Sequence, residues 1–212
     1  TVKMLNSVNF AGSGETDGGL TVNLSFELDQ GAEADGGPFD NHKVSVGSDT
    51  LGTLTVHGHG GSNAAKAVDA TASGDLWDNT FGFTTGTTGN SVKAGPSGTG
   101  LVVYTLPTFA DGVALDVSYD SAGENDGSAT AIGLAYTGIE GLTVKLGSGN
   151  DEQTAGKTAD YTTMSASYVY GSITAGISAS EYDHTNLSAD QEVKSFGLTY
   201  TCLLYTSDAA DE

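Results

Sequence analysis

The sequence predicts an all-β protein, an antiparallel up-and-down transmembrane β-barrel that crosses the membrane with strands. Three observations support this fold class. Apolar and polar residues alternate in one segment after another, as in strands whose two faces meet different surroundings. The connections between these segments alternate between short turns and longer polar loops. Tyrosines gather near segment ends, where membrane barrels carry interfacial aromatic girdles.

The alternation is clearest in residues 20–29, which read LTVNLSFELD. One face of this predicted strand carries Leu20, Val22, Leu24, Phe26 and Leu28. The opposite face carries Thr21, Asn23, Ser25 and Glu27. Period-two alternation alone does not say whether the apolar face meets a protein core or lipid.

Eleven segments follow the same pattern and are predicted as strands. They cover residues 4–12, 20–29, 42–47, 51–58, 100–106, 113–120, 129–136, 142–147, 160–170, 172–182 and 193–200. Short turns alternate with longer connections at 30–41, 59–99, 121–128, 148–159 and 183–192. Tight turns at one end and long loops at the other are typical of outer-membrane barrels. The Greek-key crossings of a soluble sandwich would break this rhythm.

Composition excludes several classes of function. The formal net charge is −20, and all seven basic residues are lysines, so the chain would repel nucleic-acid phosphates. No run of apolar residues reaches the ~20 needed for a membrane helix. No P-loop, zinc cluster or nucleophile elbow is present, so we expect no enzyme activity and no bound cofactor. The acidic loops at 123–127 and 149–153 could hold Ca²⁺ or Mg²⁺ loosely, without EF-hand spacing.

Several stretches taken in order resemble the trimeric general porins of Gram-negative bacteria, especially those of alphaproteobacteria. They are VNFAGSGETDGGLTVNLSFELD (8–29), HKVSVGSDTLGTLTV (42–56), GHGGSNAAKAVDATASGDLWD (58–78), LVVYTLPTFADGVALDVSYD (101–120) and AIGLAYTGIEGLTVKLGSG (131–149). The resemblance covers most of residues 1–201. It implies an outer-membrane, water-filled diffusion channel for small polar solutes and ions, with a homotrimeric assembly and contacts to membrane lipid and lipopolysaccharide.

The resemblance also implies a partial barrel over residues 1–201. Porins of this kind have about sixteen strands, so one strand would be missing in front and about four behind. Residues 59–99 match the loop that folds into the lumen and narrows the pore. Residues 202–212, CLLYTSDAADE, resemble the translated end of a transposon-based sequencing adapter, and we expect them to be a non-native tail. The family usually sets arginines opposite its loop acids, and this chain has no arginine.

Candidate functional residues follow from these two arguments. If the apolar face meets lipid, alternation places a set of polar side chains on the lumen wall, including Asn23, Glu27, Lys43, His57, Asp116 and Lys145. Within the predicted constriction loop the charged residues are Asp69, Asp75, Asp78 and Lys66. An excess of acids at a constriction would favour cations. The alternative is that these are ordinary solvated loop charges.

A second function class remains open from the sequence. An acidic, β-rich secreted adhesin or surface-layer module would also show alternating strands, with divalent cations damping its charge. Its aromatic residues would then be ordinary cross-strand pairs. Behaviour in detergent and in a planar bilayer separates the two classes.

Overall fold

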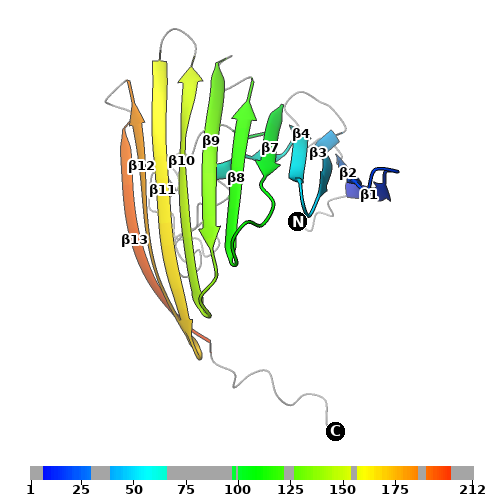
Figure 1. Cartoon of the computed structure of the whole chain (residues 1–212). Coiled ribbons are helices and arrows are strands. Elements are labelled where there is room, and N and C mark those ends of the chain that lie inside the picture. The colour runs from blue at the N-terminus through cyan, green and yellow to red at the C-terminus, as the bar shows by residue number, and fades with distance from the viewer. Residues whose placement is uncertain are drawn as a thin grey trace, which may run out of the picture.

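The computed structural model describes residues 7–29, 39–65, 97–98, 100–121, 127–153, 157–185 and 190–201. These residues form an eleven-stranded antiparallel sheet in which each strand pairs with its neighbour along the chain (Figure 1). Its strands are β1 (Ser7–Glu15), β2 (Thr21–Asp29), β3 (Phe39–Ser48), β4 (Gly52–His59), β7 (Leu101–Thr105), β8 (Val113–Asp120), β9 (Ser128–Tyr136), β10 (Leu142–Gln153), β11 (Lys157–Tyr170), β12 (Ile173–His184) and β13 (Gln191–Tyr200). A separate small ladder joins β5 (Gly61–Ser62) to β6 (Ser97–Gly98).

The up-and-down order of the strands confirms the predicted fold class. All eleven predicted strands are present, and the sheet runs from β1 at one edge to β13 at the other without closing into a ring. Among the described residues no helix is both long and apolar enough to span a membrane.

One predicted loop was wrong. Residues 148–159 were expected to be a connection, but β10 continues to Gln153 and β11 already begins at Lys157. Their polar side chains pair across the sheet: the Thr130 hydroxyl donates to Asn150 Oδ1 at 2.7 Å, and the Ser128 hydroxyl donates to Glu152 Oε2 at 3.1 Å. Strand pairing therefore persists after the apolar alternation has ended.

The register gives the sheet one apolar face and one polar face. A single row of paired residues crosses six strands on the apolar face and contains Val22, Val46, Leu54, Tyr104, Val117 and Ile132. Many of these apolar side chains stay exposed, among them Leu24, Leu54, Met164, Ile177, Phe196 and Leu198. Because so much apolar surface is uncovered across a whole face, lipid is its natural surrounding.

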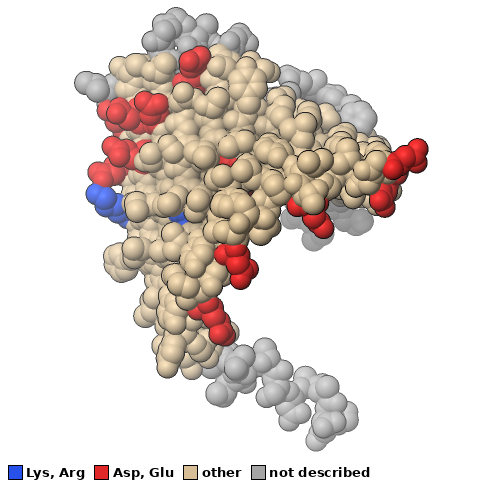
Figure 2. All heavy atoms as spheres, in the orientation of Figure 1, with Lys and Arg blue, Asp and Glu red and all other residues tan. Residues whose placement is uncertain are grey.

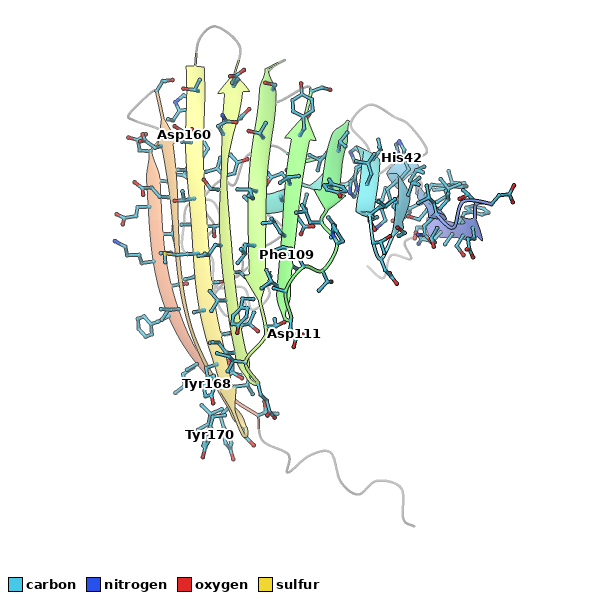
Figure 3. All side chains as sticks on the ribbon, in the orientation of Figure 1. His42, Phe109, Asp111, Asp160, Tyr168 and Tyr170 are labelled. Carbon is cyan, nitrogen blue, oxygen red and sulfur yellow. The ribbon has the colours of Figure 1, made fainter. Side chains whose placement is uncertain are left out.

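The tight turns lie at one end of the sheet, here called the turn end. Gly112 and Gly141 occupy the left-handed region there, with φ of 71° and 76°. A Cβ on Gly141 would lie 2.5 Å from the carbonyl oxygen of Val169 in β11, so glycine suits both its conformation and its close packing. Figure 3 shows Tyr168 and Tyr170 near this end, with Asp160 at the opposite end, here called the loop end.

Buried residues collect on the polar face rather than between two layers. The buried cluster consists of Ala64, Ala65, Ala131, Ala159, Tyr161 and Tyr182, with Val193 packed against it. Ala64 and Ala65 belong to the long connection after β5, and the other members lie in β9, β11, β12 and β13. The start of that connection therefore lies against the polar face of the sheet.

Candidate functional site

Small polar side chains line the polar face of the first three strands. Ala11, Gly12, Ser13, Asn23, Leu24, Ser25, Lys43 and Ser45 surround an open hollow of about 360 Å³. The Asn23 amide nitrogen lies 3.4 Å from the Ser45 hydroxyl, which accepts its hydrogen bond. Side chains of this size and polarity leave room for water against the wall.

One row of the polar face carries five titratable side chains. The pairing joins Ser25 to Lys43, Lys43 to His57, His57 to Leu101, and Leu101 to Asp120. The same row continues through Ala129, Asp151, Ala159 and His184. Five strand spacings separate the first base from the second acid, about 24 Å along the sheet. In this row Lys43 and His57 lie on β3 and β4, Asp120 and Asp151 on β8 and β10, and His184 on β12.

The connection after β4 turns onto this row. The Ala64 amide donates to the Ser118 hydroxyl at 2.9 Å, in a buried bond between residues 54 positions apart. Gly61 lies against both His57 and Leu101, so closely that a Cβ there would come within 2.7 Å of the imidazole. Leu101 is fully buried. Residues 61–65 therefore cover the middle of the polar face, next to β4, β7 and β8.

The register places each predicted wall residue on the polar face. Asn23 pairs with Ser45, Glu27 with Asn9, Lys43 with His57, Asp116 with Thr105, and Lys145 with Ala135 and Ser165. The four predicted constriction residues, Asp69, Asp75, Asp78 and Lys66, lie outside the described residues. That either group lines a pore stays a prediction.

Sequence reasoning missed a buried polar group near the loop end of the polar face. Asp120, Asp151 and His184 are at most 8% exposed. The ring of His184 stacks on Tyr182 at 6.1 Å between centroids, and its backbone N–H donates to Asp190 Oδ1 at 2.9 Å. Continuing the alternation of β10 beyond Gly147 would have found Asp151, because every second residue returns to the same face.

The described residues contain no group of three or more metal-ligating side chains that could hold an ion. In the acidic stretch 149–153, Asp151 pairs with Ala129 on the polar face, whereas the neighbouring Glu152 pairs with Ser128 and lies on the opposite face. Loose Ca²⁺ or Mg²⁺ binding at the acidic loops stays a prediction.

An up-and-down antiparallel sheet with one exposed apolar face and one polar face defines a membrane β-barrel type of protein. The chain belongs to the Gram-negative porin family, whose model matches residues 1–207. This membership confirms the predicted family and the predicted location in the outer membrane, and it argues against the secreted adhesin.

Solved structures support the same fold. OmpT, an outer membrane protein of Vibrio cholerae, aligns with a TM-score of 0.64 and 16% identity over 93% of this chain and 63% of its own. An anion-selective porin from Comamonas acidovorans aligns with a TM-score of 0.51 and 16% identity over 91% of this chain and 61% of its own. The chain thus spans less than two thirds of either structure. A search of curated proteins finds no match.

Proposed function

We propose that this chain forms the wall of a passive, water-filled diffusion channel for small hydrophilic solutes and ions. This proposal rests on the separation of an apolar face from a polar face across all eleven strands of the sheet. Exposed apolar residues suit lipid, and small hydroxyl and amide groups on the other face suit a wetted lumen. The family is one of channels rather than of enzymes, and the proposed function needs no cofactor.

Residues 59–99 are the proposed constriction. The described beginning of this segment is held on the polar face by the Ala64–Ser118 hydrogen bond and by the buried alanine cluster. With the polar face as the proposed lumen wall, the described residues 61–65 would occupy part of the lumen cross-section. Asp69, Asp75 and Asp78, with Lys66 as the single base among them, would then set the charge at the narrowest point.

Cation preference is the proposed selectivity. It is supported by the net charge of −20 and by the acids of the wall, such as Asp116 and Asp120. The Comamonas porin is described as anion-selective, and at 16% identity that likeness extends to the fold alone. Selectivity is therefore argued from this chain's own charges, since rings of acids favour cations.

A homotrimer is the proposed assembly. On the apolar face of β1 and β2 the rings of Phe10 and Phe26 stack at 4.8 Å between centroids. Val8, Leu24 and Val44 remain exposed beside them. The described parts of β1–β4 contain no tyrosine, unlike the apolar face near the turn end of β9–β13. A face rich in aliphatic and phenylalanine side chains suits contact with a second copy. The remaining outer surface would contact lipid and lipopolysaccharide.

Conductance in a planar bilayer tests the proposed function. The chain is refolded into detergent micelles and added to one side of a salt-filled bilayer chamber. Stepwise openings, with a reversal potential that shows cation preference, are expected. A chain that stays monodisperse without detergent and produces no openings would contradict the channel. Openings with anion preference would contradict only the selectivity.

A further inference from the structure

Three neighbouring turns at the turn end are held in place by hydrogen bonds. They are residues 49–51, 106–112 and 137–141, here called the turn rim. The Tyr104 hydroxyl of β7 donates to the Leu51 carbonyl at 2.6 Å. The Thr137 amide donates to the Gly112 carbonyl at 2.7 Å, and the amide of Val169 in β11 donates to the carbonyl of the last rim residue at 2.8 Å. Each turn is therefore bonded to the strand or turn beside it.

Acids occupy the tips of these turns. A hydrogen bond of 3.1 Å from the Val113 amide to the Ala110 carbonyl closes a β-turn around Asp111. A bond of 3.0 Å closes the β9–β10 turn in the same way around Glu140. These two acids and Asp49 are exposed. Figure 3 shows Asp111 at the lower end of β8, and Figure 2 shows acidic atoms along that end of the sheet. The turn rim therefore presents negative charge to its surroundings.

Large apolar side chains lie beside these acids in the sequence. Leu51, Phe109 and Ile139 are each more than half exposed, and each is one or two positions from the acid of its own turn. None of the described residues of the turn rim is basic. The turn rim is therefore an apolar surface that carries negative charge without a lysine to balance it.

Contact with hydrocarbon does not explain these apolar side chains. On the apolar face of the strands the paired residues form continuous apolar rows, as in Leu115, Leu134 and Leu146. In the turn rim, by contrast, an acid accompanies each large apolar side chain, and an ionised carboxylate is costly in hydrocarbon. Short turns of outer-membrane barrels lie on the periplasmic side. The turn rim therefore suits water at the periplasmic surface rather than the lipid layer.

The acids of the turn rim recur at a regular interval across the sheet. Adjacent turns lie two strands apart in the sheet order, so their tips recur on the order of every 10 Å. An extended polypeptide rises about 3.3 Å per residue, so every third side chain recurs at a similar distance. A segment with lysine or arginine at every third position would pair its bases with Asp49, Asp111 and Glu140. The apolar side chains between the bases would contact the exposed tips.

We propose that the turn rim is a docking surface for a basic, partly apolar segment of a periplasmic protein. Two attractions favour this partner: charge complementarity to the three acids, and burial of Leu51, Phe109 and Ile139. Because hydrogen bonds already hold the turns, little ordering of the rim opposes binding. This inference rests on the outer-membrane location of the sheet and does not require the channel to conduct.

Synthetic peptides of defined composition test the surface. Each full chain is refolded into phosphatidylcholine nanodiscs, and the binding of fluorescent peptides is followed by anisotropy. The probe repeats Lys-Leu-Ser, and the control peptides repeat Glu-Leu-Ser and Lys-Ser-Ser. Empty nanodiscs measure the binding of each peptide to the lipid itself.

A matched pair of variants separates the turn rim from the net charge of the chain. Asp111→Asn with Glu140→Gln removes two charges from the turn rim. Glu181→Gln with Glu192→Gln removes two charges from the loop end of β12 and β13, where these residues pair across the sheet. A third variant, Phe109→Ser, removes an apolar side chain from the turn rim and keeps its charge.

The wild type should bind the Lys-Leu-Ser peptide more tightly than either control peptide. The rim charge variant should raise the Kd of this peptide about tenfold in dilute salt, because two surface ion pairs are lost. The increase should nearly vanish in 1 M salt, where the screening length is about 3 Å. Phe109→Ser should raise the Kd about fivefold in dilute salt and in 1 M salt alike, because apolar contact is not screened. The loop-end variant should bind like the wild type.

An equal loss in the loop-end variant would attribute binding to net charge and would overturn the surface. Equal binding of the Lys-Ser-Ser peptide would also overturn it, because the apolar tips would then contribute nothing. Binding in detergent micelles that disappears in nanodiscs would place the turn rim among lipid headgroups, with the same consequence. Circular dichroism of each variant shows whether the sheet has formed. Conductance of the same samples reports separately on the proposed channel.

Discussion

Tyr161 of β11 lies across Gly149 of β10, and its hydroxyl donates to the Thr130 carbonyl of β9 at 3.4 Å. The tyrosine is 2% exposed and belongs to the buried cluster on the polar face that also contains Ala64 and Ala65. Glycine makes this possible, because any Cβ on residue 149 would collide with the phenol ring and with the Thr130 carbonyl. The tyrosine ring therefore covers the backbone of Gly149, where another residue would place its own side chain.

Gly149→Ala should therefore destabilise the sheet. Forcing a methyl group into this contact moves the ring or the strand, and overpacking of this kind costs about 1–3 kcal/mol. Denaturant titration followed by circular dichroism measures the change in free energy of unfolding. The control is Gly12→Ala, where nothing lies within 4 Å of the added Cβ, and little change is expected. An equal loss in both variants would show that the tyrosine contact is not responsible.

The two faces predict opposite effects for adjacent residues of β2. Leu24 is 45% exposed on the apolar face, and its neighbour Asn23 lies on the polar face. Leu24→Lys should reduce the folded, membrane-inserted fraction, because a lysine facing lipid near the midplane costs about 2–4 kcal/mol. Asn23→Lys should insert normally and change single-channel conductance. The folded fraction is read from heat-modifiable migration on a gel. Equal insertion of both variants would contradict the assignment of the faces.

The sequence was sufficient for the strands and their faces because both depend on local alternation. Residues 148–159 show where that information ends. Their outward residues are polar, so the apolar–polar contrast disappears while the backbone pairing continues. The alternation therefore did not predict Asp151 as a polar-face residue, although its side chain is only 1% exposed. The Ala64–Ser118 bond joins residues 54 positions apart, and no local pattern encodes a contact of that kind. It depends on where the connection after β5 meets the sheet.

That hydrogen bond gives a prediction for the proposed constriction. Ser118→Ala leaves the buried Ala64 N–H without its acceptor, which costs about 1–3 kcal/mol. Residues 61–65 should then exchange amide hydrogen faster, while the exchange of strands β8 and β9 stays slow. Hydrogen–deuterium exchange with mass spectrometry resolves the two regions. Ser45→Ala, which removes a polar-face hydroxyl outside this contact, is the control. Unchanged exchange at 61–65 in Ser118→Ala would show that the alanine cluster alone holds the segment.

Ion selectivity should respond to charge on the polar face only. Lys43 lies on the polar face opposite Ser25 and His57, and Lys194 lies on the apolar face opposite Ala179. Lys43→Gln removes a positive charge from the proposed lumen wall and should shift the reversal potential in a salt gradient toward stronger cation preference. Lys194→Gln makes the same change in net charge outside the lumen and should leave the reversal potential where it is.

Salt dependence separates a local effect of Lys43 from a general effect of net charge. The screening length is about 10 Å at 0.1 M salt and about 3 Å at 1 M. A wall charge acts on ions that pass within the lumen, so the Lys43→Gln shift should be largest in dilute salt and small in 1 M salt. A shift of equal size in Lys194→Gln would mean that the reversal potential reports the charge of the whole protein. That result would contradict the proposal that the polar face is the conducting surface.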